Sequence, residues 1–261
     1  MESLMDSLPR GLEEAVARAI QTLDLEGLRR TYREQNECVF LERFLPAELV
    51  DRLLVPEVEK LRPNVHRNYI PGFKKGGALS SHLLAEKAPP FFALYRHPAF
   101  IDFLGQLVGV SVIPCPEHDP HACALYFYTE PGDRMGFHYD TSYYNGARYT
   151  VLMGLIQRSE RCRLVCHLYR DDPTRETREV QLAYGPGSLV IFNGDKLWHA
   201  VTPLAEGEER VVLTMEYVTD PEMGVFKRFV SNMKDAIAYF GPGTLVGRKP
   251  RLHSTAGKEL P

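Results

Sequence analysis

The sequence lacks three features that would assign it to a special class of protein. Its longest strongly apolar run, residues 149–156, is too short to cross a bilayer, which takes about 20 residues. The acidic N-terminal stretch MESLMDSLPRGLEE has no apolar centre of the kind found in secretory signals. The five cysteines are few and odd in number, so no disulfide framework is indicated. We therefore expect a cytoplasmic protein.

An excess of positive charge is also missing. The chain has 31 Lys and Arg against 34 Asp and Glu, a formal net charge of −3. Nucleic acids favour a strongly basic surface, so we do not expect nucleic acid as the main partner, although a local basic groove stays compatible with this balance. The lack of a long apolar run argues against a membrane as a partner. The composition, 44% hydrophobic and 25% charged, is ordinary for a globular protein. We expect one domain over residues 1–261, of unassigned oligomeric state.

The first 120 residues are predicted to be a mainly helical lead-in. Helices are predicted at residues 12–35, 47–54 and 98–108, from helix-forming composition and apolar spacing. Residues 38–45 are apolar and rich in strand formers. Residues 63–80 contain many prolines and glycines, which predicts a loop.

From residue 121 to 220 the pattern changes to short strands separated by turn residues. Strands are predicted at residues 123–129, 137–141, 149–157, 163–169, 179–184, 188–193, 199–203 and 210–218. This spacing is typical of a β-sandwich or barrel. A helix is predicted at 221–240, and the Gly- and Pro-rich tail 241–261 is expected to be mobile. The expected fold class is α+β, a β core buttressed by helices.

A possible metal site lies in the segment Gly136-Phe-His-Tyr-Asp-Thr141. On a strand, His138 and Asp140 would point to the same face, because side chains alternate with period two. His199 follows 61 residues after His138, at the start of another predicted strand. Two histidines and one carboxylate are the ligand set of non-haem iron(II) oxygenases. The His138 and Asp140 pair alone is also typical of a polar loop.

Arg210 lies within a strand of alternating pattern and gives a second indication. An arginine buried in a barrel needs a partner, and a ligand carboxylate bound in bidentate fashion would satisfy it. Tyr126 and Tyr128 share one face of an earlier strand, and a tyrosine hydroxyl can bond the same carboxylate. Alternatively, Arg210 pairs with Glu208 or Glu209 at the surface and Tyr126 is an ordinary core residue.

These segments resemble a known family. The run YTEPGDRMGFHYD at 128–140, the run GSLVIFN at 187–193, His199 and Arg210 are similar to the iron(II)/2-oxoglutarate-dependent dioxygenase superfamily. The resemblance is closest to its prolyl-hydroxylase-like arrangement, and it covers roughly residues 120–218. It implies a double-stranded β-helix, or jelly-roll, core.

The resemblance also implies roles for individual residues. His138, Asp140 and His199 would hold Fe(II), and Arg210 would bind the far carboxylate of the co-substrate 2-oxoglutarate. Further contacts to 2-oxoglutarate are expected from Tyr126, Tyr128 and Thr214. Dioxygen would be the second co-substrate.

The length and central motif are similar to a bacterial branch of the superfamily that acts on free amino acids and contains hydroxylases and halogenases. The halogenases have Gly or Ala in place of the carboxylate ligand so that chloride can bind iron, and Asp140 therefore disfavours halogenation. The implied function is hydroxylation of an unactivated C–H bond of a small polar metabolite such as a free amino acid, with succinate and CO2 as co-products. Alternatives are desaturation or cyclisation, or action on a protein side chain. A cupin-like metal protein that does not use 2-oxoglutarate is a further alternative, but it has no reason to bury Arg210.

Candidates for the substrate pocket are Arg67, Asn68, Tyr143, Arg148 and Glu216. Arg67 and Asn68 fall in the predicted loop that could cover the barrel mouth. Tyr143 and Arg148 follow the His138 segment closely and could line the entrance. Glu216 shares a strand face with Arg210 and would be a counter-ion for a substrate amine. For each of these residues an ordinary surface position is the competing interpretation.

A structural zinc site is a rival hypothesis for the cysteines. Cys162, Cys166 and His167 lie close together in the sequence, and Cys115 or Cys123 could complete a ligand set. Because Cys162 and Cys166 flank an apolar, strand-like run, the two are better interpreted as small buried hydrophobic residues.

Overall fold

The computed structural model describes residues 8–140 and 144–222. The helix predicted at 221–240 lies outside the described residues except for its first two positions, and the tail 241–261 lies outside them entirely. Tyr143 also falls outside the described ranges. Within these ranges, no helix is both long and apolar enough to span a membrane.

The N-terminal helical region is divided where one helix was predicted over residues 12–35. The structure has α1 at Arg10–Thr22 and α2 at Leu25–Glu34. The break occurs because Asp24 acts as the N-cap of α2, and its side chain accepts a hydrogen bond of 3.0 Å from the backbone N–H of Gly27.

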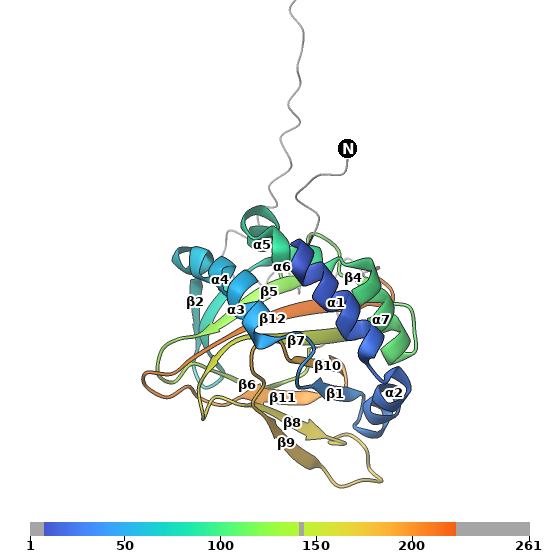
Figure 1. Ribbon diagram of the computed structural model, residues 1–261. Coiled ribbons are helices and arrows are strands. Elements are labelled where there is room, and N and C mark those ends of the chain that lie inside the picture. Colours follow the sequence, from blue (N-terminus) through green and yellow to red (C-terminus); the bar gives the residue numbers. More distant parts are fainter. Residues whose placement is uncertain (1–7, 141–143, 223–261) are drawn as a thin grey trace, which may run out of the picture.

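The remaining helices pack on one face of the sheet (Figure 1). The predictions at 47–54 and 98–108 are confirmed by α3 (Ala47–Leu53) and α7 (Pro98–Val108). The other helices are α4 (Val55–Leu61), a 3-10 turn (Arg62–Asn64), α5 (Ser81–Lys87) and α6 (Pro89–Tyr95). Helix α7 ends at Gly109, whose φ of +85° is a left-handed conformation that glycine adopts without steric cost.

The strands form one curled antiparallel sheet. They are β1 (Cys38–Leu41), β2 (His66–Ile70), β3 (Lys74–Leu79), β4 (Ile113–Pro114), β5 (Cys123–Tyr128), β6 (Arg134–His138), β7 (Arg148–Arg158), β8 (Leu164–Leu168), β9 (Arg178–Leu182), β10 (Leu189–Asn193), β11 (Trp198–Val201) and β12 (Glu209–Val218). The order is β1-β10-β7-β12-β5-β3-β6-β11-β8-β9, with β2 beside β3 and β4 beside β12. The eight strands predicted after residue 121 are present, although β6 begins and ends three residues before the predicted 137–141.

The loop predicted at 63–80 is wrong, because β2 and β3 form a hairpin inside the sheet. Strand β3 pairs with both β5 and β6, with Lys74 opposite Met135. The glycines that suggested a loop allow close packing instead. A Cβ on Gly77 would lie 2.4 Å from a Val65 methyl and 3.2 Å from the Phe127 Cβ. Glycine therefore fits a crowded strand here.

Alternation along the strands divides the core into two layers. On β12, Val211, Leu213 and Met215 pack with the helices, while Val212 belongs to an inner cluster. Figure 1 shows the helices over one face of the sheet and β6, β11, β8 and β9 on the opposite side. The inner cluster includes Tyr128, Leu152, Val190, Phe192, Val212, Leu164 and Cys166, from both halves of the curled sheet. The same inner face carries Arg210, Thr214 and Glu216 of β12.

Candidate metal centre

His138, Asp140 and His199 come together at one end of the curled sheet. Each offers one ligand atom, and these atoms all lie within 4.8 Å of one another. His138 and His199 are direct cross-strand partners on β6 and β11, with ring centroids 4.3 Å apart. Asp140 lies two residues beyond the end of β6, so the predicted shared strand face is wrong in detail. The chain after the strand still brings its carboxylate to the histidines.

Backbone carbonyls fix the orientation of both imidazole rings. The Nδ1 atom of His138 lies 2.9 Å from the carbonyl oxygen of Gly136, and that of His199 lies 3.0 Å from the carbonyl oxygen of Leu197. A carbonyl only accepts, so each Nδ1 donates and each Nε2 keeps its lone pair. Those Nε2 atoms lie 3.3 and 3.7 Å from the two carboxylate oxygens of Asp140. The three donors therefore face one another.

The electrostatics of the three side chains suit metal binding. Burial raises the pKa of the Asp140 carboxyl, but His199, His138 and Arg148 outweigh this and hold that pKa well below its usual value. Burial, together with His138, lowers the pKa of His199 to about 4. Near neutral pH the cluster therefore presents a carboxylate and a neutral imidazole, the protonation states that a metal ion requires.

The donor set fits iron(II). Two imidazole nitrogens and one carboxylate oxygen, with further coordination positions left open, are characteristic of non-haem iron oxygenases. Within residues 8–140 and 144–222 this is the one group of three such side chains close enough to share an ion. The side chains of His138 and Asp140 are 19% and 21% exposed while that of His199 is 6% exposed, so the centre is open on one side.

Arg210 is buried in the barrel, and its predicted surface alternative is wrong. The residue is only 1% exposed. Glu209 instead forms ion pairs with Arg62 and Arg158, and Glu208 accepts a hydrogen bond of 2.6 Å from the Ser159 hydroxyl. Neither glutamate therefore neutralises the Arg210 guanidinium.

The surroundings of Arg210 fit a ligand carboxylate. Its guanidinium lies 4.6 Å from the ring centroid of Tyr184 and 5.4 Å from that of Tyr128, and it donates to the Cys162 sulfur at 3.7 Å. The Nε atom has no hydrogen-bond partner among the described residues. A buried cation whose neighbours are two rings and a thiol is costly unless an anion joins it.

The other predicted 2-oxoglutarate contacts lie on the same two strands. Arg210 pairs with Tyr128 across β12 and β5, and Tyr126 lies two residues before Tyr128. Thr214 is buried four residues after Arg210. The Tyr126 hydroxyl is 2.9 Å from Nδ1 of His121. A role for these side chains in 2-oxoglutarate binding remains a prediction.

Lys74 is a second buried cation that sequence reasoning missed. It was assigned to a surface loop, but it is 2% exposed, and its Nζ lies 5.3 Å from the ring centroid of Tyr126. The adjacent Lys75 has a side chain that is 31% exposed and bonds the carbonyl oxygen of Pro131. Adjacent residues of a strand point to opposite faces, so Lys74 is buried and Lys75 is partly exposed. Because the two residues are of the same type, the sequence did not show which of them would be buried.

Two of the predicted substrate residues lie on β2. The Arg67 guanidinium forms a bidentate ion pair of 2.7 and 2.9 Å with the fully buried Asp133, and it also lies 2.9 Å from Glu130. These contacts hold the 129–133 turn against β2 and give Arg67 a structural role, while its pocket role stays a prediction. Asn68 is buried on the same strand.

Arg148 and Glu216 lie beside the metal centre but are paired with each other. The Nε of Arg148 donates to a Glu216 carboxylate oxygen at 3.0 Å, and both residues are buried. The same Glu216 oxygen lies 2.8 Å from the Thr150 hydroxyl, which is 2.9 Å from Asp140. Burial raises the pKa of Glu216 to about 8, against the attraction of Arg148. Asp119, 4.0 Å from Arg148, extends this buried polar group.

The zinc hypothesis has no support in the described residues. Cys162 and Cys166 belong to the inner cluster, whereas Cys115 and Cys123 belong to the helix-side cluster. His167 pairs with Glu179 at 3.2 Å, away from the four thiols. The cysteines are therefore separated by the sheet, and they behave as small buried hydrophobic residues.

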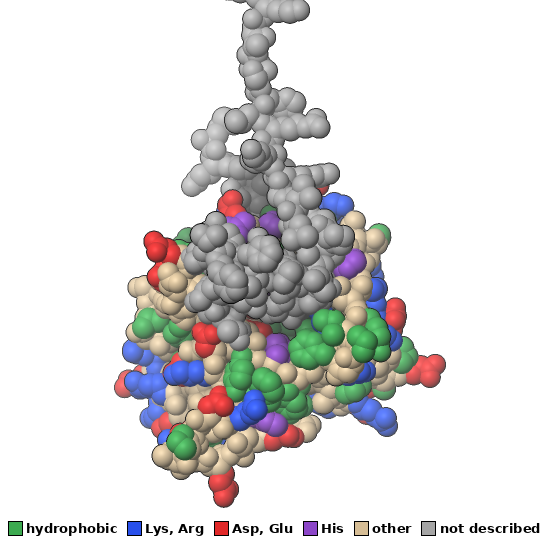
Figure 2. Space-filling view, turned by 180° about the vertical axis from the view of Figure 1, so that it is seen from behind, with side chains coloured by type: hydrophobic (Ala, Val, Ile, Leu, Met, Phe, Trp, Pro, Cys, Tyr) green, Lys and Arg blue, Asp and Glu red, His purple; other side chains and the backbone are tan. Residues whose placement is uncertain are grey.

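An aromatic group covers the outer face of the strands that carry the two histidines. The ring centroid of Phe137 lies 6.0 Å from that of Trp198, with the two rings nearly parallel, and 4.4 Å from that of His167. The Arg170 guanidinium lies 4.0 Å above the Trp198 ring. Figure 2 shows one face of the molecule, where hydrophobic and histidine side chains lie side by side. These contacts brace β6, β8 and β11 from the side opposite the metal centre.

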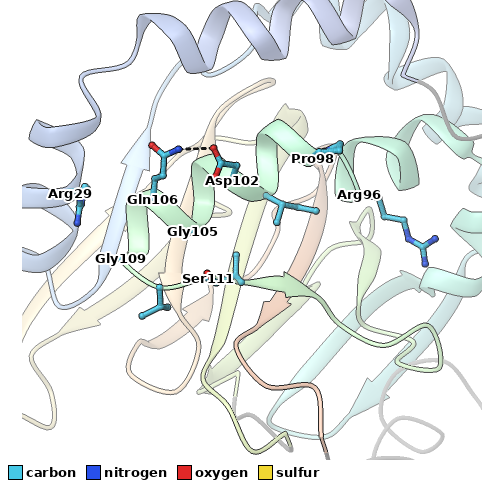
Figure 3. A pocket seen from close by; sticks show the side chains of 11 residues that line it. Arg29, Arg96, Pro98, Asp102, Gly105, Gln106, Gly109 and Ser111 are labelled. Atoms are coloured by element: carbon cyan, nitrogen blue, oxygen red, sulfur yellow. Dashed lines mark hydrogen bonds between the residues drawn. The ribbon is translucent and has the colours of Figure 1, made fainter.

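A surface cavity of about 640 Å³ lies on the helical side of the protein. It is lined by α7, by residues 109–112 that follow it, and by Arg29 and Arg96. Figure 3 shows these two arginines at opposite ends, with Gln106 donating to Asp102 at 2.6 Å between them. None of the three ligand residues lines this cavity.

A comparison with models of protein families identifies one match. The model described as "HalD: Halogenase D" matches residues 20–228. A comparison with curated proteins finds no match.

Solved structures with a similar fold include two prolyl hydroxylases and a carbocyclase. A prolyl-4-hydroxylase from Pseudomonas putida has a TM-score of 0.54 and 16% identity, covering 74% of this chain and 97% of that one. A prolyl hydroxylase from Trichoplax adhaerens, solved with a hypoxia-inducible-factor peptide, has a TM-score of 0.59 and 14% identity, covering 87% and 98%. The non-haem carbocyclase SnoK from nogalamycin biosynthesis has a TM-score of 0.62 and 16% identity, covering 81% and 91%. These likenesses confirm the double-stranded β-helix fold.

Proposed function

This chain belongs to the Halogenase D family, and on that basis we propose that it is an iron(II)- and 2-oxoglutarate-dependent oxygenase that hydroxylates a small polar metabolite. The observation that carries the choice of hydroxylation is the carboxylate of Asp140, which lies between the Nε2 atoms of His138 and His199. A halogenase needs a free coordination position for chloride at that place. In this chain the Asp140 carboxylate would occupy that position.

The protein would hold iron through one oxygen of Asp140 and the Nε2 atoms of His138 and His199. Bound iron(II), with 2-oxoglutarate and dioxygen, supplies the oxidising power for breaking a C–H bond, and succinate and CO2 are the co-products. The surrounding inner cluster, which includes Phe192 and Leu152, excludes water from the side opposite the open face. Phe192 also packs edge-on against the His199 ring, with centroids 4.9 Å apart.

Arg210 would bind the far carboxylate of 2-oxoglutarate. Its fork of N–H groups matches a carboxylate in bidentate geometry, and its Nε needs an acceptor. Tyr128 and Thr214 lie on the same inner face and would add hydrogen bonds from their hydroxyls. The Lys74 ammonium lies near the Tyr126 ring and would add a second positive charge near the proposed 2-oxoglutarate site.

The buried charges beside the metal support a small polar substrate. Arg148 and Glu216 form an ion pair there, and Asp119 adds a second carboxylate. A zwitterion such as a free amino acid carries one group for each sign of charge, so it could exchange partners with this pair at little electrostatic cost. Burial raises the pKa of Glu216 to about 8, and a substrate ammonium group beside it would favour the ionised carboxylate. Glu216 would then receive the substrate amine, as the sequence hypothesis holds.

The reaction outcome would be set by how the substrate is placed. A carbocyclase and a prolyl hydroxylase share this fold. Hydroxylation requires no special geometry beyond a C–H bond near the metal, whereas cyclisation or desaturation needs a second reacting atom held in position. We therefore favour hydroxylation of a free metabolite, and product analysis by mass spectrometry distinguishes the outcomes through a gain of one oxygen or a loss of two hydrogens.

The test is an anaerobic titration of the purified protein with Fe(II) and then 2-oxoglutarate, followed by visible absorption of the chelate. A screen of free amino acids and related metabolites would then be scored by succinate release. His138→Ala should abolish the absorption band and succinate formation. His167→Ala is the matched control, because this histidine is outside the ligand group, and it should leave both intact. A protein that binds neither iron nor 2-oxoglutarate would refute the proposed function.

A further inference from the structure

Thr150 connects the metal centre to the buried ion pair. It lies on β7 with 0% exposure, directly opposite Glu216 of β12 in the antiparallel ladder. Its hydroxyl oxygen lies 2.9 Å from Oδ2 of Asp140 and 2.8 Å from Oε2 of Glu216. This single side chain therefore touches both a proposed ligand carboxylate and the partner of Arg148.

The two oxygens of the Asp140 carboxylate have different surroundings. Oδ1 lies 3.3 Å from Nε2 of His138, whereas Oδ2 lies 3.7 Å from Nε2 of His199 and within hydrogen-bond distance of the Thr150 hydroxyl. A carboxylate oxygen that accepts a hydrogen bond in this way is held in place and is a weaker metal ligand. Oδ1, which accepts no hydrogen bond from Thr150, is left as the better metal ligand.

We propose that Thr150 is a positioning residue, whose hydroxyl holds Oδ2 of Asp140 so that only Oδ1 is presented to the metal ion. One-oxygen ligation keeps neighbouring coordination positions open for 2-oxoglutarate and dioxygen. This inference rests on the proposed function, because it assumes a metal ion bound by the three ligand residues.

Counting donors indicates where the Thr150 proton points. A threonine hydroxyl donates only one proton, so it can serve only one of the two carboxylates. Glu216 already accepts from Nε of Arg148 at 3.0 Å, whereas Nε2 of His199 keeps its lone pair and has no proton to donate to Oδ2 of Asp140. We therefore expect the Thr150 hydroxyl to donate its proton to Oδ2 of Asp140. The short contact to Glu216 is satisfied if that carboxyl carries a proton, which agrees with its raised pKa.

The position of Thr150 explains why a hydroxyl is needed there. Valine has nearly the same shape, has a high strand propensity and would fill the same space without a polar atom. Burying a hydroxyl is costly unless it is hydrogen-bonded. A purely structural residue at this place would therefore be better served by valine, and the hydroxyl is explained by its contacts with the two carboxyl groups.

The experiment compares metal and 2-oxoglutarate binding in full-length Thr150→Val and Thr150→Ser proteins. Co(II) is titrated anaerobically and followed by its visible spectrum, and Fe(II) with 2-oxoglutarate is followed by the chelate band. Thr150→Val should weaken metal affinity roughly 10- to 100-fold and change the Co(II) spectrum, as for other residues that orient metal ligands. Thr150→Ser should behave nearly as the unsubstituted protein. Thr31→Val, which removes a hydroxyl on α2 that donates to the Gly27 carbonyl, is the control and should change neither measurement.

The outcomes separate this inference from the proposed function. If the unsubstituted protein binds no metal with 2-oxoglutarate, the function itself fails. If it binds both and Thr150→Val matches it in affinity and Co(II) spectrum, only the positioning role is overturned. Should Thr150→Val fail to fold, Thr150→Ser and Thr150→Ala leave the same methyl-sized gap and differ in the hydroxyl alone. Equal metal affinities in that pair would also overturn the inference.

Discussion

His138 and His199 are 61 residues apart in the sequence, yet they are direct partners across β6 and β11, with ring centroids 4.3 Å apart. The pairing aims both rings into the barrel, and each Nδ1 is held by the carbonyl of the residue two positions earlier. The geometry of the metal centre is thus a property of the β ladder. Only the carboxylate of Asp140 comes from outside a strand.

Replacing Asp140 should vacate the coordination position that a carboxylate fills in a hydroxylase and chloride fills in a halogenase. In Asp140→Ala we expect succinate formation to fall at least about 100-fold, since a direct ligand is lost. We also expect the absorption band of the iron and 2-oxoglutarate chelate to become sensitive to added chloride, which can bind at the vacated position. The unsubstituted protein should be insensitive to chloride. Asp171→Ala, which removes a carboxylate bonded to the Tyr139 hydroxyl, serves as the control. Chloride insensitivity in Asp140→Ala, with iron and 2-oxoglutarate still bound, would count against our assignment.

Replacing Arg210 should have opposite effects on binding and on stability. Arg210→Met should weaken 2-oxoglutarate binding by roughly 30-fold to several thousand-fold, the loss expected when one partner of a buried, hydrogen-bonded charge pair is removed. Thermal stability without 2-oxoglutarate should stay the same or rise, because a buried cation without an anionic partner is replaced by a side chain that fits an apolar site. Calorimetric titration and thermal unfolding measure the two effects.

The matched control for Arg210 is Arg170→Met, which changes an arginine that lies over Trp198. It should leave the affinity for 2-oxoglutarate unchanged. Unaltered affinity in Arg210→Met would show that another cation, such as Lys74, binds the co-substrate.

The raised pKa of Glu216 predicts how stability depends on pH. Its pKa is about 8 in the folded protein against an ordinary value of 4.5, so the folded state binds an extra proton between these pH values. Stability from this group is therefore fully present below about pH 4.5 and is lost as the pH rises towards 8, by up to roughly 5 kcal/mol. Glu216→Gln cannot lose that proton, and its free energy of unfolding should fall less between pH 5 and 8.5.

The difference in free energy of unfolding between the unsubstituted protein and Glu216→Gln, measured across this pH range, is free of contributions from titrating groups that both proteins contain. His199 and Asp140 have lowered pKa values and lose stability in acid, in the opposite direction, but they are present in both proteins. Chemical unfolding at several pH values provides the measurement. Parallel curves for the unsubstituted protein and Glu216→Gln would mean that Glu216 is ionised throughout.

Arg67 should prove to be a structural residue, contrary to the sequence hypothesis of a pocket role. Arg67→Met leaves the buried Asp133 carboxylate with the backbone N–H groups of Thr129 and Glu130 as hydrogen-bond donors and with the more distant Lys75, at 3.9 Å, as an ion-pair partner. We expect unfolding to become easier by roughly 1–3 kcal/mol, the cost of removing one partner of a buried polar pair. The Michaelis constant for the substrate should change little at a temperature where the variant is folded. A large rise in that constant without a change in thermal stability would restore the original hypothesis.

Strand alternation made much of the inner face predictable. Along β12 the sequence places Arg210, Thr214 and Glu216 on one side and apolar residues on the other, and all three are buried in the structure. Alternation is a local property of an extended chain, so it can be found without knowledge of neighbouring strands. The same reasoning predicted that His138 points to the inner face of its strand, although β6 ends at His138 and does not reach Asp140.

The errors came where local composition and long-range packing disagree. Glycines in the 63–80 segment indicated a loop, but Gly77 lets β3 approach Phe127 of β5 closely. Lys74 therefore became a buried residue of a central strand. Glycine is favoured both in loops and at close backbone contacts, and only the neighbouring strand distinguishes the two.

The sequence by itself determined which side chains could bind iron and 2-oxoglutarate, because ligand chemistry and strand period are contained in the residues and their spacing. The tertiary structure alone decided the partner of each buried charge. It pairs Arg148 with Glu216, leaves the Nε of Arg210 open for a ligand and sets Thr150 against Asp140. These contacts depend on the register between strands far apart in the chain, and register is fixed by the packing of the whole sheet.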